Sequence, residues 1–327
     1  MSQSWPAFYS ELVQFGLQIN PYTNDAKGNP WPFVAAAAKV LDTSAFDSLW
    51  IYDHFLYEGG FSGHPFPEPV LECFTVLGAV AAITRRIRLG QLVVGVPYRN
   101  PAMLAKQATS LDHISHGRSI LGLGGGWHQR EHEAYGWGEF EPVGVRLKRL
   151  REAIAIILAM WGEQPAEFSG DFYHIQRLTE YPLPVQKPRP PIMIGGSGEK
   201  VTLRITARHA DIANVQGPPD KVRHLFEVLH EHCAAVKRPY QAITRSIYTT
   251  IILGENEAEV ERKREEFGAF IPAGGALIGT PPQVIDKLRA YEDAGVQYVI
   301  FRTPDWFRLD SIRLFDEEVL RPLSAGS

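Results

Sequence analysis

The feature that most constrains the fold of this 327-residue chain is an alternation of short apolar segments with longer helical ones, repeated eight times. Short apolar runs predict buried strands, and the segments between them carry apolar residues at helical spacing. Strands joined through helices run parallel, because each connection must cross back over the sheet. The predicted strands cover residues 14–20, 48–52, 87–94, 118–123, 191–196, 211–215, 246–253 and 298–301.

Eight such units favour a closed (β/α)8 barrel, the TIM barrel of the α/β class, over an open doubly wound sheet. We expect one domain over residues 1–327, with insertions near 162–190 and 268–282. A two-domain division at the Pro-rich connection 162–190 is the alternative, but the alternation continues across it. Barrel enzymes carry their sites on the loops after the strands. Those loops contain Asn20, Asp53, His54, Val94–Asn100, Gly124–His132, Gly195–Gly198, Asn214–Gly217 and Arg302–Trp306.

Composition narrows the function classes. A net charge of −4 gives no basic footprint for nucleic acid and no polybasic membrane anchor, so we expect a small-molecule partner. The two cysteines, Cys73 and Cys233, form no C-x-x-C pair, and Cys73 reads as a buried thiol. No secretory signal pattern and no apolar stretch of about 18 residues occurs, which predicts a cytoplasmic protein without membrane contact.

The stretch LGLGGGWHQREH, residues 121–132, spells parts of two known motifs. A dinucleotide fingerprint would need glycine where Trp127 or Gln129 stands, and would belong to the first strand–helix turn. A zinc helix could use His128 and His132 with Glu131, but the glycines on both sides leave little room for a helix. We favour neither motif and expect no metal, although the spacing alone does not exclude one.

The stretch IGGSGEK, residues 194–200, joins the end of a predicted strand to a helix expected to begin at about Glu199. Free backbone N–H groups at a helix N-terminus suit a phosphate, and the Ser197 hydroxyl could add a donor. Gly195, Gly196, Ser197 and Gly198 are therefore candidate ligands of a phosphate-bearing cofactor. A plain tight turn is the alternative.

The stretch WIYDHF, residues 50–55, ends the second predicted strand with Asp53 and His54. A carboxylate next to an imidazole can orient it for proton transfer near neutral pH. The alternative is a polar pair that only caps the strand. Aromatic residues in the neighbouring loops suggest a pocket for a large planar ring: Phe55, Tyr98, Trp127 and Trp306.

These segments together resemble the bacterial luciferase-like monooxygenase superfamily, and within it the oxidoreductases that depend on the deazaflavin coenzyme F420. The resemblance covers nearly the whole chain. It is carried by WIYDHF, by the block 84–136, by PPIMIGGSG and by GTPPQVIDKLRAYEDAGVQYVIF.

The resemblance implies a barrel that binds a flavin-type ring at its mouth. Asp53 and His54 match the family's pair beside the ring. Leu92 and Val93 match a bulge in the third strand, where a non-prolyl cis peptide bond often backs the ring. The glycines and serine at 195–198 match the family's phosphate-binding loop.

One position departs from the pattern. Related sugar-phosphate dehydrogenases carry a catalytic glutamate where this chain has Trp127, with a further acidic residue at Glu131. The departure suggests a fairly apolar substrate, a pocket wall formed by Trp127 and a secondary catalytic role for Glu131.

The predicted activity is hydride transfer between F420 and a small organic substrate, with His54 handling a proton. FMN-dependent monooxygenation is the close alternative. A zinc hydrolase using His128 and His132 and a non-catalytic flavin-binding protein are more distant ones. The resemblance also implies that the chain assembles into a homodimer or a higher homo-oligomer.

Overall fold

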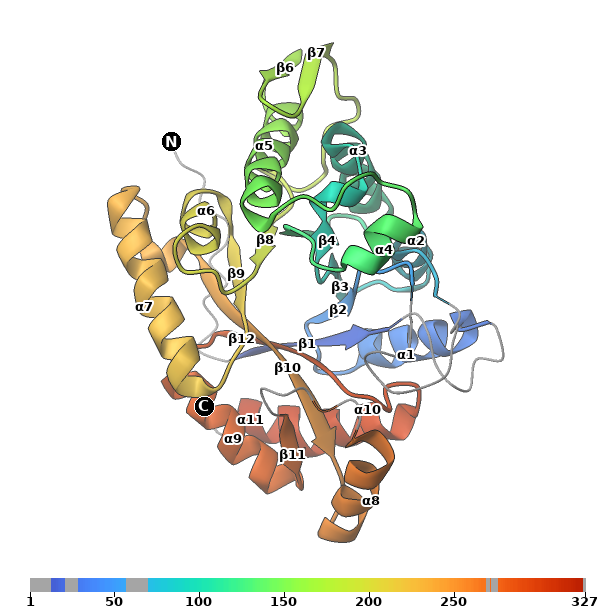
Figure 1. The fold of residues 1–327 in the computed structure, drawn as a ribbon. Coiled ribbons are helices and arrows are strands. Elements are labelled where there is room, and N and C mark those ends of the chain that lie inside the picture. Colours follow the sequence, from blue (N-terminus) through green and yellow to red (C-terminus); the bar gives the residue numbers. More distant parts are fainter. Residues whose placement is uncertain (1–12, 21–28, 57–69, 269–270, 272–275, 326–327) are drawn as a thin grey trace.

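The computed structural model describes residues 13–20, 29–56, 70–268, 271 and 276–325. Eight parallel strands form a closed ring, and each pairs with both of its neighbours (Figure 1). The (β/α)8 prediction is therefore confirmed. In ring order the strands are β12 (Tyr298–Arg302), β1 (Gln14–Ile19), β2 (Ser48–Ile51), β3 (Arg88–Gln91), β5 (Ser119–Gly124), β8 (Ile192–Gly195), β9 (Ile212–Val215) and β10 (Thr244–Leu253).

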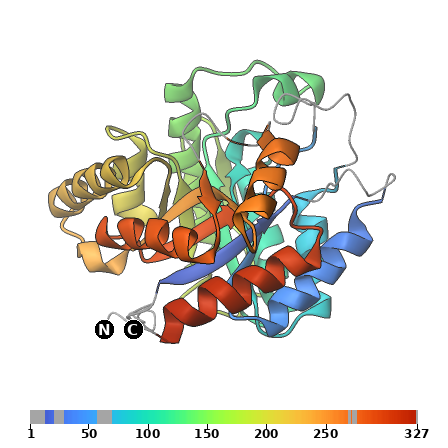
Figure 2. The ribbon, with the colours of Figure 1, turned by 90° about the horizontal axis from the view of Figure 1, so that it is seen from below.

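Helices surround the ring, as the views in Figures 1 and 2 show. Asn100 caps α3 by accepting hydrogen bonds from the Ala102 and Met103 amides, and Pro101 is the first residue of that helix. The helices are α1 (Trp31–Thr43), α2 (Cys73–Ile83), α3 (Pro101–Ile114), α4 (Gln129–Ala134), α5 (Val143–Trp161), α6 (Thr202–His209), α7 (Pro219–Ala235), α8 (Glu257–Phe267), α9 (Pro281–Asp293), α10 (Leu309–Phe315) and α11 (Arg321–Ala325), with a π-helical stretch at Asp316–Leu320 and 3-10 turns at Val96–Tyr98 and Tyr240–Ala242.

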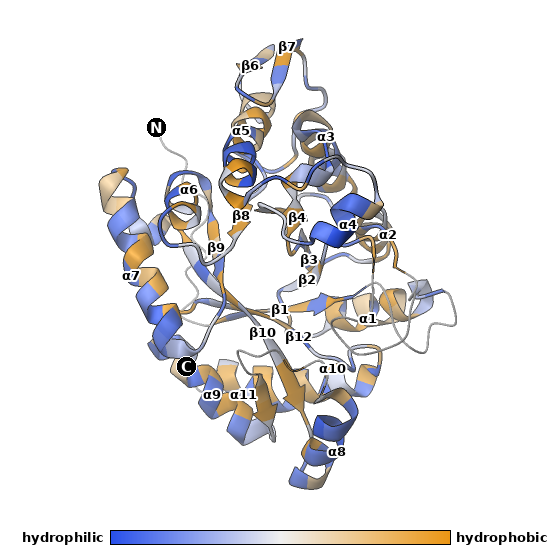
Figure 3. Ribbon diagram, viewed as in Figure 1, coloured by the Kyte–Doolittle hydropathy of each residue, from blue (hydrophilic) through white to orange (hydrophobic). Residues whose placement is uncertain are grey.

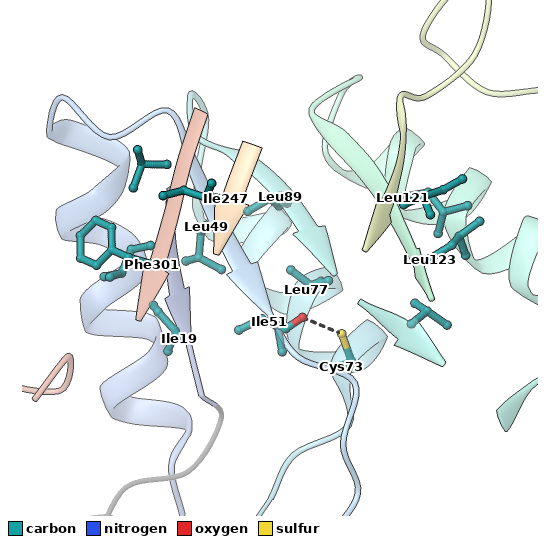
Figure 4. Close-up of a cluster of buried hydrophobic side chains, with 14 of the residues drawn as sticks. Ile19, Leu49, Ile51, Cys73, Leu77, Leu89, Leu121, Leu123, Ile247 and Phe301 are labelled. Atoms are coloured by element: carbon teal, nitrogen blue, oxygen red, sulfur yellow. Dashed lines mark hydrogen bonds between the residues drawn. The ribbon is translucent and has the colours of Figure 1, made fainter. Parts of the chain in front are cut away.

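The main hydrophobic core lies between the outer face of the strands and the helices. Apolar side chains from successive strands meet those of α2 and its neighbours, among them Ile51 and Leu77 (Figure 4). Cys73 is buried in this core, as predicted, and its thiol lies 3.7 Å from the Ile51 carbonyl oxygen. Helices such as α8 are mostly hydrophilic, in contrast to the strands (Figure 3).

A smaller core fills the inside of the ring. Trp50 points inward from β2, and its indole N–H donates to the Ser48 hydroxyl at 2.6 Å, which in turn bonds to the Tyr298 hydroxyl. The indole fits because its neighbours are Gly16 and Gly90; a Cβ atom at Gly16 would lie 2.6 Å from the Trp50 nitrogen. This packing closes the ring below the strand ends that carry the candidate site.

Several elements differ from the sequence-based prediction. The third predicted strand is interrupted at Leu92 and Val93, after which β4 (Val94–Gly95) pairs with β5. The Pro-rich stretch 162–190 contains an antiparallel hairpin, β6 (Ala166–Ser169) with β7 (His174–Leu178). A short strand, β11 (Leu277–Gly279), extends the sheet beside β10, and the residues before it at 269–270 and 272–275 lie outside the described ones. In the described part of the chain, no helix is both long and apolar enough to span a bilayer.

Candidate active site

A cavity of about 1110 Å³ opens at the C-terminal ends of the barrel strands. Most of the predicted site residues line it: Asp53, His54, Leu92, Val93, Trp127, Gly195 and Gly196. Of the other three, Glu131 lies behind His54, and Ser197 and Gly198 do not belong to the described lining. Asn20 and Asn214, on loops also singled out from the sequence, line the cavity too.

Glu131 orients the imidazole of His54. Its carboxylate lies 3.1 Å from His54 Nδ1 and accepts the backbone N–H groups of Phe55 and Leu56, the latter at 3.0 Å. The Glu131 side chain is fully buried, whereas that of His54 is 21% exposed. Burial acts to raise the pKa of Glu131, but the bonds from His54 and the two amides hold it below its ordinary value. An ionised carboxylate only accepts, so Nδ1 carries the proton and Nε2 is the nitrogen left for a ligand.

Asp53 does not orient His54, contrary to the sequence-based expectation. Its carboxylate accepts two bonds from the Arg99 guanidinium, at 2.5 and 2.8 Å, and Arg99 also binds Glu72 at 2.7 Å. The reason is geometric, since adjacent residues of an extended chain project to opposite sides. Burial raises the pKa of Asp53 above its usual value, and Arg99 opposes that shift. The two adjacent residues therefore have separate partners in space: Arg99 for Asp53 and Glu131 for His54.

The peptide bond between Leu92 and Val93 is cis, in agreement with what the family resemblance implies. The Val93 side chain rests on glycines of the two following strands. A Cβ atom at Gly124 would lie 2.7 Å from Val93 Cγ2, and one at Gly195 would lie 3.1 Å from Val93 Cγ1. Two glycines of the LGLGGG stretch therefore lie inside β5, where Gly122 faces the Gln91 carbonyl and Gly124 receives Val93. They make room for the bulge rather than for a ligand.

The loop after β8 only partly matches the predicted phosphate-binding loop. Gly195 and Gly196 line the cavity. The Ser197 hydroxyl accepts the Gln216 amide at 3.1 Å, which ties this loop to the next one. The following helix, α6, begins at Thr202 rather than near Glu199, so its N-terminus is farther along the chain than expected.

The aromatic residues predicted at the mouth have different positions. Trp127 lines the cavity with 57% of its surface exposed, and its ring packs edge-on to His54 with centroids 5.3 Å apart. Tyr98 also lines the cavity, and Phe55 packs against it. Trp306 is the exception, because it is 2% exposed and belongs to the outer core.

His128 and His132, the two histidines that match the zinc-helix motif, do not share a helical face. His128 precedes α4 as its cap, and its Nδ1 accepts the Glu131 amide at 3.1 Å. His132 lies within α4, buried against Tyr98 and Phe140. In the described ranges of the chain, no group of three or more potential metal ligands gathers.

The strand ends of β1, β10 and β12 add further polar residues to the cavity, of which the sequence singled out Asn20 and Arg302 but not Gln18, Tyr248 or Thr250. The Tyr248 hydroxyl donates to the Gln18 side-chain oxygen, and the Gln18 amide donates to Asn20 at 3.0 Å. Arg302, at the end of β12, donates through Nε to the Thr250 hydroxyl at 3.0 Å. These side chains face the ring interior, where strand alternation predicts inward residues but not their polarity.

Comparison with known proteins agrees with this architecture. An F420-dependent glucose-6-phosphate dehydrogenase of Amycolatopsis mediterranei is 26% identical over 315 residues, which cover 85% of this chain and 90% of that protein. The coenzyme F420-dependent tetrahydromethanopterin reductase of Methanopyrus kandleri superposes with a TM-score of 0.78 at 20% identity, over 95% of this chain and 99% of that one.

A further structural neighbour is the oxygenating constituent of 3,6-diketocamphane monooxygenase from Pseudomonas putida, solved in complex with FMN. It superposes with a TM-score of 0.75 at 18% identity, over 95% of this chain and 98% of that one. A model of the luciferase-like monooxygenase family matches residues 13–274. The chain therefore belongs to the luciferase-like monooxygenase family.

Proposed function

We propose that this protein is an oxidoreductase that transfers hydride between coenzyme F420 and a small organic substrate, with His54 as the proton donor or acceptor. One observation carries the proposal: His54 faces the cavity while a buried carboxylate holds its Nδ1 atom. An imidazole fixed in this way presents a single nitrogen, Nε2, to whatever occupies the cavity.

The residues of the cavity fit a tricyclic cofactor. Its volume of about 1110 Å³ slightly exceeds the roughly 300–1,000 Å³ usual for ligand sites, which leaves room for a ring and a substrate together. Leu92 and Val93 would lie against the ring, and the backbone at Gly195 and Gly196 offers an approach free of side chains. When bound, the deazaflavin supplies the carbon that accepts or donates hydride.

The protein residues then have separate tasks. His54 exchanges a proton with the substrate through Nε2. Glu131 is a positioning residue rather than the second proton donor that the sequence suggested, because it is buried behind the imidazole. Trp127 offers an exposed aromatic face beside His54, which supports an apolar group on the substrate next to the reacting centre.

The relatives support this choice of cofactor. The glucose-6-phosphate dehydrogenase and the tetrahydromethanopterin reductase both depend on F420 by name. The FMN-bound monooxygenase neighbour supports the second candidate, in which reduced FMN and O2 oxygenate the substrate. Both cofactors share a tricyclic ring and a phosphate, so the same residues would serve either.

The experiment is a binding titration with F420 and with FMN, read by ring fluorescence, followed by turnover assays of the loaded protein on a panel of alcohols, aldehydes and sugar phosphates. We expect F420 to bind more tightly than FMN. His54→Ala should lower kcat by about 10²- to 10⁴-fold while the dissociation constant of F420 changes little. Tight FMN binding without F420 affinity would overturn the cofactor, and full activity of His54→Ala would overturn the role of His54.

A further inference from the structure

We infer that the part of the cavity running from the loop after β9 to the end of β12 binds an anionic group, a phosphate or a carboxylate, through Lys221, Lys287 and Arg302. We call these three residues the basic wall. All three line the cavity. In the ring order of the strands, β9 stands directly across from β2, so the loop after β9 faces His54. The identity of the ligand rests on the proposed function; the charge of the wall does not.

Two lysines of the basic wall are brought together by a contact between α9 and the loop that follows β9. Lys221 lies in the first turn of α7, and its side chain packs on Gly217, where a Cβ atom would lie 2.7 Å from Lys221 Cδ. The Gly217 carbonyl accepts the Tyr291 hydroxyl of α9 at 3.0 Å. Lys287 is four residues before Tyr291, on the same face of α9. Both lysines therefore border the same rim of the cavity.

Arg302 adds a third positive charge deeper in the cavity. It ends β12, in register with Gln18 on one side and Thr250 on the other. The bond from its Nε to the Thr250 hydroxyl fixes the guanidinium on the cavity wall. The side chain is half-buried, so its charge is screened less by water than those of the surface lysines.

No described carboxylate pairs with either lysine of the basic wall. Asp53 is the acidic residue in the described lining of the cavity, and Arg99 already binds it in two places. Within the described chain, Lys221 and Lys287 form no ion pair, and Lys287 donates instead to the Ile278 carbonyl at 2.5 Å. By contrast, the buried Lys263 of α8 lies 2.9 Å from the Asp305 carboxylate. A cavity lined by one sign of charge attracts a ligand of the other sign.

Two sources could supply the anion: the phosphate-bearing tail of the cofactor, or an acidic group of the substrate. In either case the reacting groups would lie near His54 and the negative charge would lie at the basic wall. The apolar group proposed beside Trp127 would then be one end of a ligand assembly whose other end is charged.

The test compares Lys221→Gln/Lys287→Gln with a matched control, Lys39→Gln/Arg289→Gln. The control removes the same charge; Arg289 lies on α9 and Lys39 on α1, and both are exposed and outside the lining of the cavity. Thermal unfolding of both variants shows whether they fold. In the first arm, the cofactor-free protein is titrated with F420 and with its phosphate-free deazaflavin. In the second arm, the F420-loaded protein is titrated with inorganic phosphate, and ring fluorescence is read in both.

If the cofactor tail occupies the basic wall, the preference for F420 over the phosphate-free ring falls at least tenfold in the lysine variant and not in the control. If the substrate supplies the anion, inorganic phosphate binds the loaded protein saturably, and the lysine variant weakens that binding at least tenfold. The inference is overturned if neither arm depends on these lysines. Should the protein bind neither F420 nor FMN, the proposed function fails, and the thermal shift caused by phosphate in the cofactor-free protein still tests the basic wall.

Discussion

The two sides of the cavity differ in how their charges are partnered. On the side of β2 and β3, three acidic groups of the described residues bind protein partners: Asp53 and Glu72 bind Arg99, and Glu131 binds His54. On the basic wall, the described lysines form no ion pair with a carboxylate. The first side is organised before a ligand arrives, as proton transfer requires. The second side is completed by its ligand, so substitutions on the two sides should have different consequences.

The largest effect on stability is expected for Arg99→Met. The substitution leaves the buried Asp53 carboxylate without its partner, which typically costs about 3–5 kcal/mol of unfolding free energy. Burial already raises the Asp53 pKa, and loss of Arg99 raises it further. A folded-state pKa above the unfolded value means stability is lost as pH rises. Urea unfolding should show the deficit shrinking towards acidic pH; a constant deficit would contradict this account.

Glu131→Gln should cost about 1.5–3 kcal/mol at neutral pH, because the buried carboxylate accepts three bonds, one of them from the imidazole. Its folded pKa is lowered, so its contribution is present above the unfolded pKa and disappears as pH falls through the folded one. The wild type and the variant should converge in stability at acidic pH. With bound cofactor, kcat should fall while the cofactor dissociation constant stays nearly constant.

Gly124→Ala tests whether the Val93 side chain, on the side of the cavity that carries His54, packs against Gly124. The added methyl group would lie 2.7 Å from Val93, which predicts an overpacking cost of about 1–3 kcal/mol. Val93→Ala in the same chain should recover part of that cost, since it removes the atoms that clash. A simple sum of the two single effects in the double variant would show that Val93 does not rest on this glycine.

Lys287→Gln should have the smallest effect on stability, within about 0.5 kcal/mol, because the side chain is exposed and forms no ion pair in the described chain. Chemical unfolding without ligand measures this directly. A loss of more than about 1 kcal/mol would show that the lysine supports the fold, and the contrast between the two sides would then be lost.

The barrel itself was predictable, because eight apolar segments at regular intervals leave few other topologies. The positions of His54, Leu92 and Val93 on the cavity followed from the family resemblance and the strand ends. The hairpin β6–β7 was missed, although Gly170 and Asp171 between two partly alternating segments are a usable turn signal.

Partners far apart in sequence could not be predicted. His54 and Glu131 are separated by 77 residues, and nothing in either segment specifies their contact. Asp53 was assigned to His54 because they are neighbours, although strand geometry separates neighbours. The basic wall depends on how α9 packs against the loop after β9, a tertiary contact with no local pattern.

The packing of Trp50 inside the barrel has a consequence for how this chain can diverge. The indole occupies space that side chains at positions 16 and 90 would otherwise fill, so these three sites constrain one another. A homologue with a larger residue at either glycine should carry a smaller one at position 50, and the reverse exchange should accompany it. Alignments of relatives are therefore expected to show positions 16, 50 and 90 changing together, because their side chains compete for the same space inside the barrel.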